Sequence, residues 1–152
     1  MNNNHFVEHH TFAIERHYHV SPATVFAAWA DPVAKSKWFP QAEQFEFRVG
    51  GREFNRGGGT TGPIYTFDAR YEEIVKDLRI VYSYIMDREK TPVNKVRISA
   101  SLTTVEFKTV EDGTRLIYTE QAAFLDGHDT PDLRMQGTHS FLNQLGEYLE
   151  SV

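Results

Sequence analysis

Alternation of apolar and polar positions predicts a sheet of six to seven strands. Phe12, Ile14 and Tyr18 share one face of residues 11–20, which form a first strand. The same two-residue period recurs further along the chain. The later strands are predicted at 45–49, 52–56, 65–74, 80–86, 96–107 and 116–124. Short turns separate them, so we expect antiparallel pairing.

A period of three to four residues predicts one long helix from Pro131 to Ser151. Thr130 is placed to cap it, and proline suits the first helical position. Its apolar stripe comprises Phe141, Leu142, Leu145, Tyr148 and Leu149. The stripe continues toward the N-terminus with Arg134, Gly137 and Thr138, none of which is a large hydrophobe. The C-terminal half therefore anchors the core, and the N-terminal half is expected to border a cavity.

Two short helices follow the first strand, opened by Ser21-Pro22 and by Asp31-Pro32. The order is strand, two short helices, consecutive strands and a long helix, which is an α+β arrangement. Only the C-terminal helix is long enough to cover one face of the sheet. The helix pair is expected to plug one end.

Three local features complete the expected architecture. The apolar positions change parity within residues 96–107, which predicts a β-bulge near Thr103-Thr104. Residues 57–62 carry four glycines and predict a mobile hairpin loop. Residues 1–10 are polar and are expected to form a flexible segment, and residues 11–152 a single domain.

Composition narrows the functional classes. The net charge of −5 disfavours a nucleic-acid or anionic-membrane surface. Cysteine is absent, which excludes disulfides, thiolate nucleophiles and cysteine metal sites. The N-terminal residues contain no apolar signal core, and no apolar run is long enough to span a membrane. We therefore expect a cytoplasmic protein.

Four segments together resemble the SRPBCC (START/birch-pollen-allergen-like) superfamily. They read FAIERHYHVSPATVFAAWADPVAKSKWF, FEFRVGGREF, GTRLIYTEQAAFLDG and RMQGTHSFLNQLGEYL. The most similar branch is named for activators of the heat-shock-chaperone ATPase. The resemblance implies a helix-grip fold, in which a curved antiparallel sheet wraps around the long helix and leaves a cavity. Related chains often have Gly-Trp where this chain has Gly137-Thr138, so this wall is smaller and more polar.

The expected ligand-binding residues lie on the inner face of the sheet and on the long helix. They are Trp38, Phe54, Tyr82, Tyr84, Tyr118, Glu120, Arg134, Thr138 and Leu142. Glu120 is the most informative, because a carboxylate on an inner face must be paired or have a raised pKa. It could act as a general acid/base or ligand anchor, or form a structural pair with Arg16, which we favour.

The sequence also allows two roles for Arg134. Its guanidinium could clamp a carboxylate or phosphate of a ligand, or form a salt bridge with Asp126 or Asp129. Arg52 and Arg56 more plausibly reach solvent than the interior. His17 and His19 have the spacing of a metal-binding pair, but the sequence offers no evident third ligand, so no metal and no cofactor are predicted.

The favoured function is binding of a hydrophobic or amphipathic small molecule in the cavity. An alternative is a cavity enzyme of cyclase or hydratase type, with Glu120 as its acid/base. The chain carries none of the common catalytic or nucleotide-binding motifs, so a binding protein is favoured over an enzyme. A co-chaperone-like interaction module is a further alternative, suggested by the resemblance. A homodimer is compatible with the sequence, although no specific feature indicates one.

Overall fold

The computed structural model describes residues 5–58, 62–91 and 93–152. Within these ranges the chain forms seven strands and three helices. In chain order they are β1 (Val7–Tyr18), α1 (Pro22–Ala30), α2 (Pro32–Lys35), β2 (Gln44–Phe45), β3 (Arg52–Gly58), β4 (Ile64–Val75), β5 (Arg79–Thr91), β6 (Asn94–Val110), β7 (Gly113–Leu125) and α3 (Pro131–Glu150).

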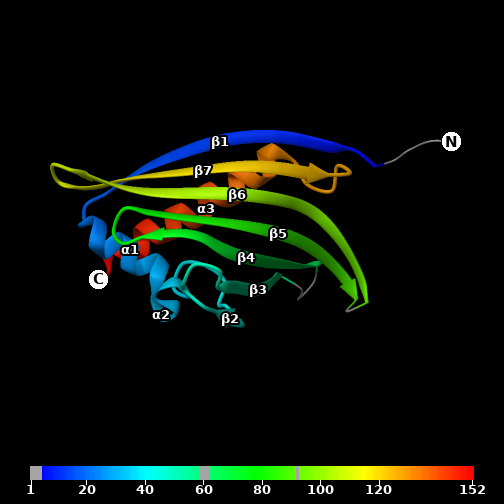
Figure 1. The fold of residues 1–152 in the computed structure, drawn as a ribbon, viewed down its shortest axis with the longest axis horizontal. Coiled ribbons are helices and arrows are strands. Elements are labelled where there is room, and N and C mark those ends of the chain that lie inside the picture. Colours follow the sequence, from blue (N-terminus) through cyan, green and yellow to red (C-terminus); the bar gives the residue numbers. More distant parts are fainter. Residues whose placement is uncertain (1–4, 59–61, 92) are drawn as a thin grey trace.

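The strands form one curved antiparallel sheet in the order β1-β7-β6-β5-β4-β3-β2 (Figure 1). Strands β2 to β7 pair with their neighbours in the sequence. Only β1 pairs across the chain, running along β7 from Val7 opposite Leu125 to Tyr18 opposite Thr114. The first and last strands therefore lie side by side, and the α+β helix-grip prediction is confirmed.

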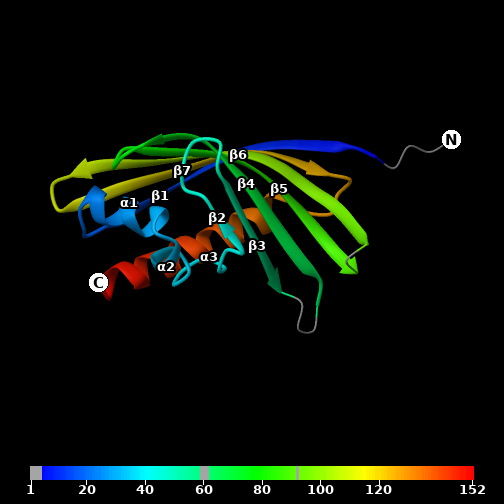
Figure 2. The ribbon, with the colours of Figure 1, turned by 60° about the horizontal axis from the view of Figure 1, so that its bottom comes forward.

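Helix α3 lies beneath the arch of the strands (Figure 2). The Thr130 hydroxyl accepts a hydrogen bond from the Leu133 N–H at 3.2 Å, which caps the helix before Pro131. The C-terminal half buries Leu142, Leu145 and Leu149 against the sheet and α1. This half anchors the core, as the sequence pattern predicts.

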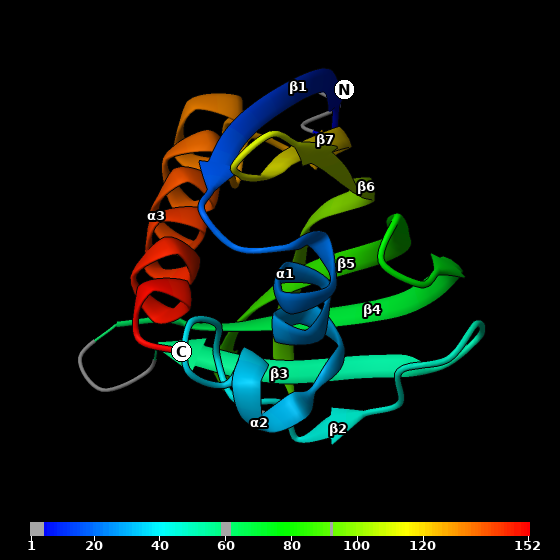
Figure 3. The same ribbon diagram turned by 90° about the vertical axis from the view of Figure 1, so that its left-hand side faces the viewer.

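The helix pair closes one end of the sheet, where Figure 3 views α1 and α2 beside α3. Asp31 ends α1 and caps α2 by accepting a hydrogen bond from the Val33 N–H at 2.9 Å. The Lys35 ammonium then reaches β3 and donates to the Glu53 carboxylate at 2.7 Å. Both side chains are nearly fully buried, so the pair joins the helices to the sheet in the interior.

Most strands extend beyond their predicted bounds, and the boundaries of β1 and β2 differ in ways that matter for the fold. Strand β1 begins at Val7 rather than Thr11, because residues 7–10 pair with β7. Strand β2 is only two residues long and includes just Phe45 of the region predicted at 45–49, since the chain turns back after Glu46. At that turn a Cβ on Gly51 would lie 2.1 Å from the Glu46 carbonyl oxygen, so glycine permits the close approach.

The predicted bulge near Thr103-Thr104 is wrong. Pairing with both neighbouring strands is continuous there, and the register shifts between β5 and β6 lie at Met86/Asp87 and at Glu89/Thr91. Gly57 and Gly58 belong to β3 rather than to a loop. The other expected loop glycine before Thr60, and the expectation for residues 1–4, lie outside the described residues.

Candidate functional site

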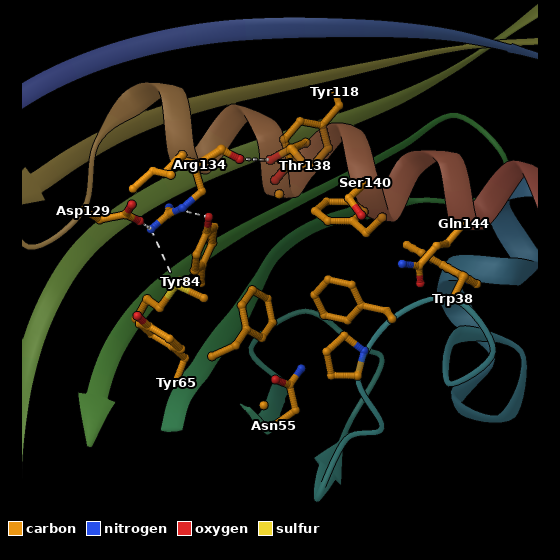
Figure 4. A pocket seen from close by; sticks show the side chains of 18 of the residues that line it. Trp38, Asn55, Tyr65, Tyr84, Tyr118, Asp129, Arg134, Thr138, Ser140 and Gln144 are labelled. Atoms are coloured by element: carbon orange, nitrogen blue, oxygen red, sulfur yellow. Dashed lines mark hydrogen bonds and ion pairs between the residues drawn. The ribbon is translucent and has the colours of Figure 1, made fainter. Parts of the chain in front are cut away.

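A cavity of about 800 Å³ lies between α3, strands β3 to β7 and the segment after α2 (Figure 4). Its aromatic and apolar lining comprises Trp38, Phe39, Pro40, Tyr65, Phe67, Tyr82, Tyr84, Met86, Ile98, Tyr118, Leu133 and Phe141. Its polar and glycine lining comprises Ser36, Lys37, Asn55, Gly57, His128, Asp129, Arg134, Gly137, Thr138, Ser140 and Gln144.

The space exists because α3 presents small side chains along this part of its length. Gly137 lines the cavity, and a Cβ built on it would meet nothing within 4 Å. Thr138 is buried and donates its hydroxyl to the Arg134 carbonyl oxygen at 2.9 Å. One turn later, Leu142 is completely buried in the core and does not line the cavity.

Packed aromatic rings form the walls. Phe67 lies against Tyr84 with ring centroids 4.8 Å apart, on the β4–β5 side. On the helix side, Phe141 contacts Phe39 at 5.3 Å and Tyr118 at 5.7 Å, in both cases edge to face. Such a lining offers broad apolar contact to a flat or branched ligand.

One end of the cavity is ionic, and its charges are already paired. The Arg134 guanidinium donates from Nη1 to the Glu120 carboxylate at 2.8 Å and from Nη2 to the Asp129 carboxylate at 2.9 Å. Figure 4 shows it directed between Asp129 and Tyr84. Burial opposes its charge, but the neighbouring acidic groups outweigh this effect and raise the pKa of Arg134 above its ordinary value.

Glu120 is completely buried and accepts four hydrogen bonds. Besides Arg134, its donors are the hydroxyls of Tyr84 at 2.7 Å, Ser101 at 2.8 Å and Tyr118 at 2.8 Å. Burial, with the charge of Glu120 among the further causes, raises the pKa of Tyr84 and Tyr118 well above 10.0. Both phenols therefore remain neutral donors, and the carboxylate has little unmet hydrogen-bonding capacity.

Polar side chains of β6 complete this network. Ser99 and Ser101 are buried on the concave face, whereas the apolar residues Ala100 and Leu102 beside them are not buried. The Ser99 hydroxyl accepts from Arg134 Nη2 at 2.6 Å. The inward positions of this part of β6 are therefore polar, because Ser99 and Ser101 form hydrogen bonds with Arg134 and Glu120.

The Asn55 amide is the clearest unused polar group at the cavity. Its side chain lies on the floor of the cavity in Figure 4 and is only 3% exposed. Its Nδ2 atom has no hydrogen-bond partner among the described residues. A buried amide without a partner is costly, so a ligand oxygen accepting from it would stabilise the complex.

Six of the nine residues predicted to bind a ligand line the cavity. They are Trp38, Tyr82, Tyr84, Tyr118, Arg134 and Thr138. Their role in binding stays a prediction.

The other three predicted residues do not line the cavity. Glu120 lies among its hydrogen-bond donors, and Leu142 is completely buried in the core. Phe54 faces outward, beneath the guanidinium groups of Arg52 at 4.6 Å and Arg56 at 5.2 Å. Outward packing beneath the two cations explains why this aromatic residue is not on the inner face.

The predicted structural pair between Glu120 and Arg16 is also wrong. Arg16 lies opposite Leu116, whereas Glu120 lies opposite Phe12, so four residues of extended strand separate the two. Arg16 instead contacts His139 at 2.8 Å and Asn143 at 3.2 Å on α3. The predicted salt bridge between Arg134 and a nearby loop carboxylate is present, and its partner is Asp129.

Sequence reasoning missed Asn55, Phe67 and Phe141 as cavity residues. Asn55 shares a strand face with Glu53, and this two-residue spacing was the available signal. The prediction instead included Phe54, the apolar residue between them, among the ligand-binding residues.

Comparisons with known proteins agree with this architecture. A solved structure from Rhizobium leguminosarum is 41% identical and covers 97% of this chain and 99% of its own, with a TM-score of 0.87. The Mll3558 protein from Rhizobium loti is 44% identical and covers 94% and 99%, with a TM-score of 0.86. The AHSA1-like protein from Aeromonas hydrophila is 20% identical over 93% of each chain, with a TM-score of 0.70, and supports the fold alone.

A comparison with curated proteins gives no match. In the described part of the chain, no helix combines the length and apolarity needed to cross a membrane. The family model described as activator of Hsp90 ATPase homolog 1-like protein matches residues 19–150. This match spans most of the sequence, and the chain therefore belongs to the family of activator of Hsp90 ATPase homolog 1-like proteins, the SRPBCC branch that its motifs resemble.

Proposed function

We propose that this protein binds a small, largely apolar and uncharged molecule in the cavity beside α3. The observation that carries this proposal is the combination of an aromatic cavity of about 800 Å³ with a guanidinium that is already paired with two carboxylates. Ligand pockets commonly measure about 300–1,000 Å³ and combine apolar walls with a few placed polar groups. The cavity has both properties.

The charge of the ligand is argued from Arg134. Its two terminal nitrogens are engaged by Glu120, Asp129 and neighbouring hydroxyls. An anionic ligand would have to displace a carboxylate from the guanidinium, and it would meet the negative charge that remains. An uncharged ligand avoids this cost and can still accept a hydrogen bond from Asn55 Nδ2.

The enzyme alternative loses the residue on which it depended. Glu120 does not line the cavity, and Tyr84 and Tyr118, which do, donate their hydroxyl protons to it. A general acid or base must come within hydrogen-bonding distance of the reacting group. The geometry therefore favours binding over acid/base chemistry at Glu120, and the co-chaperone-like alternative stays a prediction.

A fluorescent probe tests the proposal directly. Nile red is uncharged and apolar, so we expect the wild-type protein to enhance its fluorescence with saturable 1:1 binding. The variant Gly137→Leu fills space into which the wild-type helix projects no side chain. We expect it to weaken Nile red binding by more than about ten-fold, since the probe and the new side chain would occupy the same volume.

Gln136→Leu is the matched control, because Gln136 is an exposed position of α3 outside the cavity lining. It introduces the same side chain one residue earlier and should leave binding unchanged. Absence of saturable binding by the wild type, or equal binding by the wild type and Gly137→Leu, would contradict the proposal. Native mass spectrometry of the protein purified from its own host would then identify a retained ligand.

A further inference from the structure

A second cluster of chemically active side chains lies at the junction of β1 and the β6–β7 turn. His17 is the penultimate residue of β1, and His19 follows the end of the strand. Asp112 lies in the turn before β7. Figure 1 places this turn at the end of the sheet where β1 leads into α1. None of the three residues lines the cavity, and all three are exposed.

The distances within the cluster match those of a metal site. His17 Nε2 lies 3.1 Å from Asp112 Oδ1, and His19 Nδ1 lies 3.7 Å from Asp112 Oδ2. One ligand atom from each residue can be chosen so that all lie within 4.8 Å of one another. Two ligands bound to the same tetrahedral ion at about 2.0–2.1 Å lie about 3.3 Å apart, so small side-chain rotations are sufficient.

The backbone that carries the cluster is fixed on both sides. The Thr114 hydroxyl donates to the Val20 carbonyl oxygen at 2.7 Å, which ties the segment after β1 to β7. At Gly113, with a φ of +150°, a Cβ would lie 2.0 Å from the Tyr18 carbonyl oxygen. Only glycine allows the turn to come this close to β1, and this approach brings Asp112 beside the two histidines.

The surrounding charges also permit a bound cation. Arg115, which lies opposite His17 in the sheet, donates two hydrogen bonds to the Glu15 carboxylate at 3.1 and 2.7 Å. Its positive charge is therefore compensated by Glu15 rather than by Asp112. The Asp112 carboxylate is left to the two imidazoles.

We propose that His17, His19 and Asp112 bind a divalent transition-metal ion such as Zn²⁺. The protein supplies two imidazole nitrogens and one carboxylate oxygen, and water completes a tetrahedral site. Imidazole ligands favour zinc, copper and nickel, whereas Mg²⁺ and Ca²⁺ prefer sites made of oxygen. This site is independent of the cavity and of the function proposed for it.

Calorimetric titration of the tag-free protein with Zn²⁺ tests the site. We expect one ion per chain and no measurable binding of Mg²⁺ at the same concentrations. His17→Gln and Asp112→Asn should each weaken Zn²⁺ binding by more than about ten-fold, since loss of even an outer partner of a metal ligand commonly costs about 10–100-fold. Because the three side chains are exposed, the melting temperatures without metal should change little.

His9→Gln is the matched control, because His9 is an exposed histidine of the same strand, distant from the turn. It should bind Zn²⁺ like the wild type. Equal Zn²⁺ affinities for the wild type, His17→Gln and Asp112→Asn would overturn the proposal. Failure of the wild type to bind Zn²⁺ would also overturn it and leave the cluster as a histidine–aspartate ion pair alone.

Discussion

Replacing Arg134 with methionine tests whether the buried ion pair is structural. Methionine keeps an unbranched stem in α3 but removes the guanidinium that contacts Glu120 and Asp129. Glu120 is completely buried, so it would retain a negative charge without a cationic partner. Three hydroxyl donors would remain, from Tyr84, Ser101 and Tyr118.

The expected loss of stability follows from these contacts. Breaking a buried ion pair by removing one partner typically costs about 3–5 kcal/mol. The remaining hydroxyl donors moderate the penalty at Glu120, and Asp129 can regain water because its side chain is 15% exposed. We therefore expect Arg134→Met to lower the free energy of unfolding by about 3–4 kcal/mol, a large part of the roughly 5–15 kcal/mol of a typical domain.

A double-mutant cycle separates the pair from the individual side chains. Glu120→Gln leaves Arg134 paired with Asp129, so it should cost about 2 kcal/mol. The double variant should cost less than the sum of the single variants, with a coupling energy of about 2 kcal/mol. Urea unfolding followed by the fluorescence of Trp29 and Trp38, both buried, gives the free energies.

The result that would refute this reasoning is specific. A cost below about 1 kcal/mol for Arg134→Met would show that Glu120 is solvated or neutral without its partner. Strict additivity of the two variants would show that the side chains do not stabilise each other. In either case Arg134 would be available to a charged ligand, and the uncharged class proposed for the cavity would lose its basis.

Three further outcomes are expected. Burial raises the pKa of Tyr84 and Tyr118 well above 10.0, so the folded state favours their neutral forms. The free energy of unfolding should therefore be steady below pH 10 and fall above it, because the unfolded chain then loses these protons first. Urea unfolding at a series of pH values, with absorbance at 295 nm to follow tyrosine ionisation, measures this. Gly137→Ala should raise the free energy of unfolding by about 0.5–1 kcal/mol, since its Cβ meets only open space, and a lower melting temperature would contradict this. Lys35→Met should cost about 3–5 kcal/mol in urea, because Glu53 is 2% exposed, whereas the exposed control Lys37→Met should cost under about 0.5 kcal/mol.

The sequence predicted the architecture well because the core follows the ordinary periodicities. The cap and stripe of α3 located the helix, and its small N-terminal residues predicted the cavity beside it. The family resemblance supported the same arrangement. These features depend on local patterns, which survive in a single sequence.

The same reasoning failed where buried positions are polar. In β6, Ser101 faces the interior and Leu102 does not; in β3, Glu53 and Asn55 face inward and Phe54 does not. The rule that apolar residues point inward reverses the face of such strands. Ser101 and Glu53 form hydrogen bonds with partners far away in the sequence, such as Lys35 for Glu53, and no local pattern reveals those partners.

The pairing of β1 with β7 has a consequence for how the protein folds. During synthesis, the β2–β7 hairpins can form in chain order, but β1 has no strand to join until almost the whole chain has been made. Contacts so distant in sequence slow folding, and an unpaired early strand can associate with other chains. We therefore expect docking of β1 to be a late folding step, and truncation after β6 to leave an aggregation-prone edge.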